Sequence, residues 1–155
     1  MPLSTLFKSM YDFKDEDLAL ILEAFKSSTF NEGDLILREG EISDKIYFIL
    51  DGILREYSFI ETNDEPETES TFWILGANQW VYQVESFVTN TPSKSFLQAL
   101  TKLKVMYLYK SDMERLLDEI PALSKVVIKL YEYYLLQLEK RNHLHKIKKA
   151  ENRLD

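Results

Sequence analysis

Between residues 30 and 57, short apolar runs alternate with glycines, and this pattern constrains the fold more than any other part of the sequence. Three of the four glycines, Gly33, Gly40 and Gly52, fall in this stretch. Glycine reaches positive φ without a Cβ clash, and Asp-Gly between two apolar runs is a strong signal for a tight hairpin. The pattern therefore predicts consecutive antiparallel strands wound into a small β-roll, with a hairpin at Asp51-Gly52.

Further elements are predicted from residue type and periodicity. An amphipathic helix is expected from Asp15 to Phe25, where apolar residues recur at i, i+3, i+4 and i+7, with shorter helices at 84–88 and 111–120. The segment from Glu61 to Ser70 carries five acids and no base, so we expect a solvated hairpin loop. Strands rich in β-branched and aromatic residues are expected at 34–38, 46–50, 53–60, 71–75, 95–100 and 104–109.

A long helix is expected after Pro121, because neither proline nor glycine occurs from there to about Lys149. One apolar face of this helix has alternating four- and three-residue spacing, which is typical of helices that pair. We expect this face to form the interface of a homodimer. Its residues are Leu123, Val127, Leu130 and Tyr134. A single helix folded back onto its own domain is the alternative.

The predicted roll, with glycines at its turns, and the long helix that follows it resemble the cyclic-nucleotide-binding domains of the Crp/Fnr regulator superfamily. The resemblance extends from about Asp15 to Lys149. The resemblance implies a mainly β fold with flanking helices, an antiparallel jelly roll over residues 1–120. It also implies a dimerisation helix and basic hinge over residues 121–155. In the superfamily a DNA-binding winged helix follows, and that domain is absent from this chain.

The resemblance places a phosphate-binding cassette between Gly76 and Lys94, but the signature residues of that cassette are missing. Tyr82-Gln83 stands where Gly-Glu is expected, and Ser93-Lys94 stands where Arg-Ser is expected. In a shifted register Glu85 would contact a ribose and Lys94 a phosphate, but lysine cannot form the bidentate pair that arginine forms. Tight binding of cyclic AMP is therefore not expected. The candidate ligand-binding residues are Trp80, Gln83, Glu85, Ser86, Ser93 and Lys94.

An unidentified small effector, bound among aromatic side chains, is a second hypothesis for the ligand. The aromatic residues concerned are Trp73, Trp80, Tyr82 and Phe87, and the simpler interpretation is that they fill the core. Enzymatic activity is not expected, because the sequence has no P-loop and no glycine-rich dinucleotide motif. A metal site is not expected either, because the histidine pair, His143 and His145, points to different faces of a helix.

Composition and charge limit the partners. The sequence has no cysteine, which excludes disulfides and fits a reducing cytoplasm. Residues 140–155 carry six Lys/Arg and two acids, a net charge of +4, which leaves −11 for residues 1–139. With this negative charge, residues 1–139 are expected to bind the phosphates of a nucleic acid poorly. DNA contacts are therefore expected only through a further C-terminal domain. With no signal sequence and no long apolar run, we expect a cytoplasmic protein without a membrane partner.

Taken together, these patterns predict the effector-sensing and dimerisation domain of a Crp/Fnr-type transcriptional regulator, with an effector other than tightly bound cyclic AMP. One alternative is a stand-alone module of the same fold, without DNA binding, that serves protein interaction or oligomerisation. A second alternative, an enzyme resembling a cupin, is disfavoured because the predicted strands carry no histidine cluster.

Overall fold

The computed structural model describes residues 1–62 and 65–154. The helices are α1 (Leu3–Met10), α2 (Asp15–Ala24), α3 (Val84–Thr89), α4 (Lys110–Glu119) and α5 (Leu123–Leu154). The strands are β1 (Lys26–Phe30), β2 (Leu35–Leu37), β3 (Lys45–Asp51), β4 (Leu54–Thr62), β5 (Glu65–Leu75), β6 (Trp80–Val81), β7 (Phe96–Ala99) and β8 (Leu103–Tyr109).

The strands form two four-stranded antiparallel sheets that pack face to face as a roll. One sheet has the order β1-β8-β3-β6 and the other has the order β2-β7-β4-β5. Alternate residues of each strand point between the sheets and form a buried apolar core. This core contains Leu37, Ile49, Leu54, Val81, Leu97, Ala99, Leu103 and Val105. The predicted mainly β roll is therefore confirmed.

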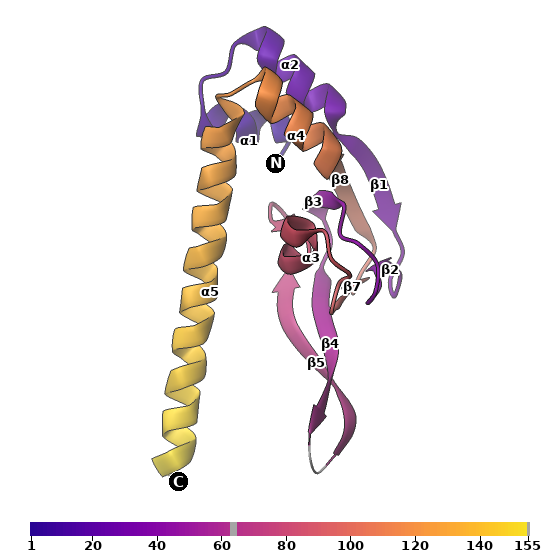
Figure 1. The fold of residues 1–155 in the computed structure, drawn as a ribbon, viewed down its shortest axis with the longest axis vertical. Coiled ribbons are helices and arrows are strands. Elements are labelled where there is room, and N and C mark those ends of the chain that lie inside the picture. The colour runs from indigo at the N-terminus through magenta and orange to yellow at the C-terminus, as the bar shows by residue number, and fades with distance from the viewer. Residues whose placement is uncertain (63–64, 155) are drawn as a thin grey trace.

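A second core joins the roll to the helices at one end of the molecule, where α1, α2, α4 and the start of α5 gather (Figure 1). Phe7 of α1, Ile21 of α2 and Leu116 of α4 are all buried there, together with Phe48 of β3. Three acids occupy the first turn of α2, where negative charge favours the helix N-terminus. These helices fix the point from which α5 leaves the roll.

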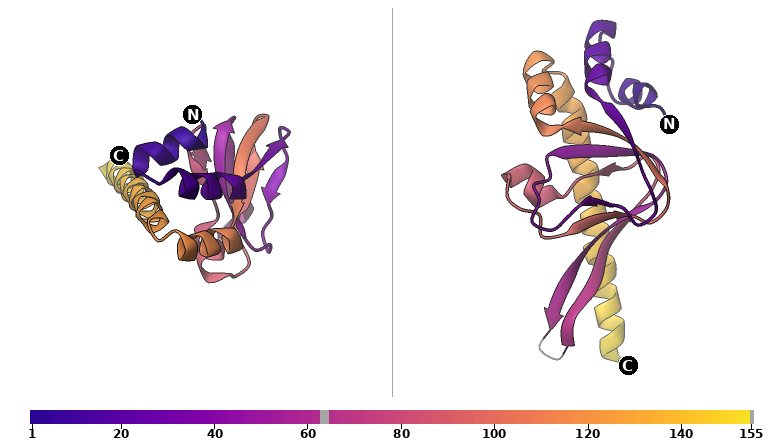
Figure 2. Two further views of the ribbon diagram at one scale, coloured as in Figure 1. Left: turned by 90° about the horizontal axis from the view of Figure 1, so that it is seen from above. Right: turned by 90° about the vertical axis from the view of Figure 1, so that its right-hand side faces the viewer.

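Helix α5 runs from this end along the side of the roll, next to the β4–β5 hairpin (Figures 1 and 2). Ring contacts bridge the two elements. The ring centroids of Trp73 and Tyr134 lie 6.2 Å apart, and the guanidinium carbon of Arg141 lies 4.8 Å from the Trp73 ring centroid. Helix α5 is thus packed against its own roll as far as Arg141.

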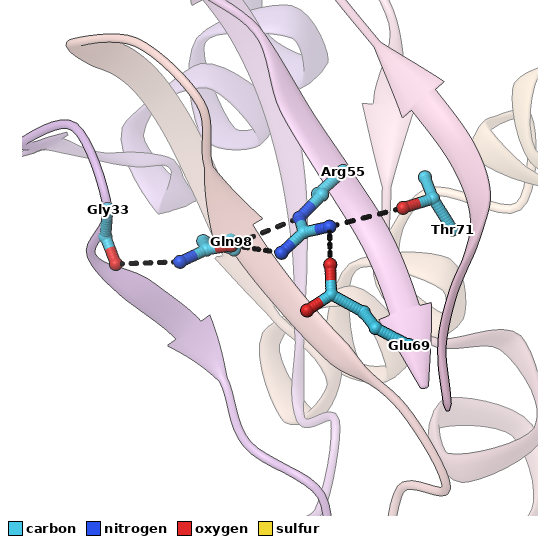
Figure 3. Close-up of polar contacts among 5 residues, drawn as sticks. All are labelled: Gly33, Arg55, Glu69, Thr71 and Gln98. Atoms are coloured by element: carbon cyan, nitrogen blue, oxygen red, sulfur yellow. Dashed lines mark hydrogen bonds and ion pairs between the residues drawn. The ribbon is translucent and has the colours of Figure 1, made fainter. Parts of the chain in front are cut away.

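The two faces of β4 have different roles, because successive side chains of a strand point in opposite directions. Arg55 lies on the outer face, where it donates hydrogen bonds to Gln98 of β7 and to Glu69 and Thr71 of β5 (Figure 3). Gln98 in turn donates to the carbonyl oxygen of Gly33 at 3.2 Å. This network ties three strands and the turn before β2 together, and it leaves the next residue, Glu56, on the inner face.

One local prediction was wrong, and another was correct only in part. Gly52 has a positive φ of 105° as expected, but Asp51-Gly52 forms no hairpin, because β3 and β4 belong to different sheets. The turn instead carries the chain from one sheet to the other. The predicted hairpin loop from Glu61 to Ser70 does lie in a hairpin, that of β4 and β5, but most of it is strand, since Ile60 pairs with Thr68 and Thr62 pairs with Glu65. Asn63 and Asp64 lie outside the described residues.

Other elements were missed or displaced. Helix α1 and strands β1 and β6 were not predicted, and the long helix continues to Leu154 instead of about Lys149. Strand β1 alternates only weakly in hydrophobicity and owes its place to its ladder with β8, which pairs Lys26 with Tyr107. Long-range pairing of this kind leaves little trace in the local sequence.

Candidate functional site

A cavity of about 590 Å³ lies between the inner side of the roll and α5. Helix α1 contributes Leu6 and Met10 to the cavity, and the β5–β6 connection contributes Asn78 and Gln79. Strands β4 to β6 contribute Glu56, Trp73, Ile74, Leu75, Trp80 and Val81, followed by Tyr82 and Val84. Helix α5 completes the cavity with Lys129, Leu130, Tyr133, Tyr134 and Gln137. Both the roll and the long helix therefore meet any molecule bound inside it.

Aromatic rings form much of the cavity wall and are held in place by their neighbours. Trp80 packs on Phe48, with the ring centroids 4.9 Å apart, and on Phe7 of α1 at 6.4 Å. Tyr82 packs on Phe87 at 4.9 Å. Aromatic pairs at these separations gain energy beyond the area that they bury. The wall is therefore fixed in shape by contacts to the core.

Glu56 is a carboxylate on this largely apolar wall. Its Oε2 accepts a hydrogen bond from the Ser95 hydroxyl at 2.6 Å, and the Gln83 side chain also donates to the carboxylate. Burial raises the pKa of Glu56, and the hydrogen bonds from Ser95 and Gln83 and the charge of Arg141 oppose that shift. Among the described residues, no lysine or arginine forms an ion pair with Glu56.

The pKa values of neighbouring phenols are also shifted by burial. Burial raises the pKa of Tyr82, and the phenols of Tyr131 and Tyr134 add to the shift. Burial likewise raises the pKa of Tyr134, to which the Glu56 charge contributes, while Arg141 opposes the shift. The two phenols are therefore neutral at physiological pH and serve as hydrogen-bonding groups.

The segment predicted as a phosphate cassette is held together by its own side chains. The Gln83 side chain accepts a hydrogen bond from the Ser86 backbone N–H at 2.7 Å and caps α3. The Ser86 hydroxyl accepts from the Ser43 backbone N–H at 2.8 Å, and Ser86 is fully buried. Ser93 is also buried, and its hydroxyl donates to the Ser95 carbonyl at 2.7 Å. Ser86 and Ser93 therefore stabilise the segment and do not line the cavity.

The remaining predicted ligand residues separate into two groups. Glu85 and Lys94 form an exposed ion pair with 3.1 Å between Oε1 and Nζ, and the Lys94 side chain is 78% exposed. Trp80 does line the cavity, and Gln83 reaches it indirectly through Glu56. The structure thus brings Trp80 and Gln83 near one site and leaves Glu85 and Lys94 outside it.

The aromatic hypothesis fits the cavity better than the cassette hypothesis does. Trp73, Trp80 and Tyr82 all line the cavity, whereas Phe87 is buried in the core behind it. Sequence reasoning missed Glu56. The signal available was the alternation of Leu54 and Glu56 along one strand, which places both side chains on the inner face.

The residues predicted for the dimer interface lie largely against the chain's own roll. Leu123 is 3% exposed and belongs to the core beneath the helices, and Leu130 packs against that core. Tyr134 lines the cavity, and Val127 is half-buried. Leu123 is therefore unavailable to a partner, because its own domain already covers it. Pairing of α5 with a second copy stays a prediction.

Two features are absent from the described part of the chain. No helix there is long and apolar enough to cross a membrane. No group of three or more acidic, histidine or cysteine side chains gathers there in a metal-binding arrangement. His143 is exposed on α5, and the side chain of His145 lies outside the described residues.

With this geometry in place, comparison with known proteins identifies the family. The chain belongs to the cyclic nucleotide-binding domain family, whose family model matches residues 28–120. A curated relative, a cGMP-dependent protein kinase of Plasmodium berghei (strain Anka), is 28% identical over 110 residues. Those residues make up 69% of this chain but only 12% of the kinase, so the chain spans a small part of that relative.

Solved structures share the fold at low sequence identity. A cyclic nucleotide-binding domain from Methylobacillus flagellatus has a TM-score of 0.73 at 18% identity, with 89% of this chain and 81% of that chain covered. The catabolite activator protein of Thermus thermophilus has a TM-score of 0.68 at 17% identity, with 88% and 62% covered. Identities this low show the fold alone.

Proposed function

We propose that this chain is the effector-sensing and dimerisation part of a Crp/Fnr-type transcriptional regulator, with the roll over residues 1–120 and the long helix over 121–155. The observation that carries the proposal is that α5 supplies part of the cavity wall through Leu130, Tyr134 and Gln137. A molecule in the cavity contacts the roll and the helix together. It can therefore favour one position of α5 over another, which is the requirement for allosteric coupling.

Cyclic AMP is not the tightly bound effector in this proposal. The Glu56 carboxylate lies between Gln83 and Ser95, the two ends of the segment that corresponds to the phosphate cassette. Two negative charges about 4 Å apart repel by about 4 kcal/mol at an effective dielectric constant of about 20. The nearby cation of the segment, Lys94, is exposed and paired with Glu85, so it is poorly placed to offset that repulsion.

The homodimer is proposed to form through exposed apolar side chains of α5. Ile128, Tyr131 and Leu135 recur there at i, i+3 and i+7, and Leu135 is 60% exposed. In this proposal DNA is contacted by a winged-helix domain that is not among these 155 residues. The site of action is the cytoplasm, with which the cysteine-free composition is compatible.

Calorimetric titration with cyclic AMP and cyclic GMP tests the ligand assignment. We expect no heat of binding at micromolar nucleotide concentrations. Micromolar binding of either nucleotide would overturn the argument from Glu56. A regulator also requires DNA binding by the product of the complete gene, and a product that binds no DNA would favour the stand-alone interaction module.

Sedimentation velocity tests the dimer. We expect the chain to sediment as a dimer at tens of micromolar and the Leu135→Glu variant to sediment as a monomer, since a charge in an apolar interface is costly. Ile53→Glu is the matched control, because Ile53 is an exposed apolar residue between β3 and β4. A monomeric wild type would refute the pairing of α5.

A further inference from the structure

The cavity lining includes a carboxylate, whereas a site for an anion would present a positive charge. Glu56 is a half-buried carboxylate beside aromatic rings, and in the described part of the chain it has no ion-pair partner. Removing a carboxylate from water without a paired cation costs free energy. The two side chains that donate hydrogen bonds to it, Ser95 and Gln83, are neutral. Among the described residues, no cation therefore contacts Glu56 directly, and Arg141 acts on it only at longer range.

Two cationic side chains near the cavity, Lys129 and Arg141, have other contacts. Lys129 lines the cavity, but its ammonium donates to the carbonyl oxygen of Met10 at 2.6 Å, at the end of α1. Arg141 attracts the Glu56 charge at longer range, and its guanidinium lies over the rings of Phe72 and Trp73. Neither side chain forms a direct ion pair with the carboxylate.

Aromatic faces lie beside the carboxylate. Trp73 is the cross-strand partner of Glu56 in the β4–β5 ladder, so both side chains lie on the same face of the sheet. The Tyr134 phenol is close enough for the Glu56 charge to raise its pKa. The electron-rich faces of tryptophan and tyrosine attract cations, and several such rings around one site bind alkylammonium groups.

We propose that this cavity binds an organic cation, a ligand with a charged nitrogen on an apolar body, whose positive charge is held beside Glu56 and the ring of Tyr134. The inference rests on the proposed function, because it assigns a chemical class to the effector. The apolar body occupies the remainder of the cavity, against Leu130, Trp80 and their neighbours.

Three probes with the same phenyl group test the charge preference. These probes are 2-phenylethylammonium, neutral 2-phenylethanol and anionic phenylacetate, each titrated into the full chain and followed by calorimetry and tryptophan fluorescence. We expect the ammonium ion to bind at least about tenfold more tightly than the alcohol, and phenylacetate to bind most weakly.

Two variants test whether the preference for the ammonium ion arises in the cavity. Glu56→Gln keeps the shape and removes the charge, so we expect it to abolish the advantage of the ammonium ion while leaving 2-phenylethanol binding unchanged. Glu67→Gln, which neutralises an exposed carboxylate on β5, is the matched control and should bind like the wild type. Thermal unfolding of both variants checks that each is folded.

The outcomes separate this inference from the proposed function. If the alcohol or phenylacetate binds as tightly as the ammonium ion, or if Glu56→Gln keeps the preference, the cavity is an effector site but the organic-cation assignment is wrong. If none of the three probes binds at millimolar concentration, the assignment is also wrong. Micromolar binding of cyclic AMP, in contrast, overturns the proposed function itself.

Discussion

The guanidinium of Arg141 lies over the ring of Trp73, with its central carbon 4.8 Å from the ring centroid. This contact joins the second half of α5 to β5, about two helical turns beyond Tyr134, which packs on the same ring. Trp73 also lines the cavity. The position of α5 and the shape of the cavity are therefore linked through one indole ring.

Replacing Arg141 with methionine is expected to loosen this part of α5. A cation–π contact at a partly exposed site contributes about 0.5–1 kcal/mol, so the loss of global stability should be small. Hydrogen exchange measures the effect locally, and we expect faster exchange in α5 beyond Tyr134 and in β5. Lys140→Met, at the adjacent exposed position, should leave both segments protected. Equal effects of the two variants would refute a role for the ring contact.

Replacing Glu56 with glutamine is expected to stabilise the fold at neutral pH. Burial raises the pKa of Glu56, so the folded protein holds this proton to a higher pH than the unfolded chain does. Wild-type stability should therefore fall as the pH rises from the unfolded pKa through the folded pKa. Thermal unfolding of Glu56→Gln should occur at a higher temperature than that of the wild type at pH 7, and the difference should shrink toward about pH 4. A difference that grows on acidification would contradict the assigned sign.

Replacing Ser95 with alanine is expected to destabilise the protein through Glu56. The Ser95 hydroxyl donates to the carboxylate at 2.6 Å, and a hydrogen bond to a charged group contributes about 1.5–3 kcal/mol. Urea denaturation at neutral pH should show a loss of this size. In the Glu56→Gln background the loss should fall to about 1 kcal/mol, and this double-mutant cycle isolates the interaction between the two residues. Ser27→Ala, at an exposed position of β1, provides the control.

Replacing Gly52 with alanine is expected to cost more than the same change at Gly40. Both glycines have positive φ, 105° and 91°, which costs an alanine about 1–2 kcal/mol. A Cβ on Gly52 would also lie 2.4 Å from the carbonyl oxygen of Lys102, whereas a Cβ on Gly40 would have no neighbour within 4 Å. Urea denaturation should therefore place Gly52→Ala below Gly40→Ala in stability by at least about 1 kcal/mol. Equal losses would mean that the backbone shifts to relieve the contact.

The elements with strong periodicity could be predicted from the sequence, and pairing between distant segments could not. Helix α2 and strands β3 and β8 lie close to their predicted ranges, because burial on one face leaves a clear apolar pattern. The Asp51-Gly52 turn was recognised but assigned to a hairpin. A local signal specifies the turn conformation, whereas the sheet that the following strand joins depends on β5 and β7.

The same limit explains the candidate site. Trp80 and Trp73 could be proposed from residue type, but the role of Glu56 depends on its cross-strand neighbours and on Ser95, 39 residues away. For α5, the sequence contains two apolar faces. Which of them meets the roll depends on where α4 ends and directs the chain, so the residues assigned to a partner, Leu123 and Leu130, proved to pack on their own domain.

The carboxylate of Glu56 has a consequence for signalling under the proposed function. Because it is covalently part of β4, it remains next to Ser95 at a high effective concentration, so a diffusible anion would have to overcome its charge to bind there. Under that proposal, fluctuations of second-messenger nucleotides in the cell would change the occupancy of this site little. Regulators with the same fold can then operate side by side without cross-talk, each answering to its own metabolite.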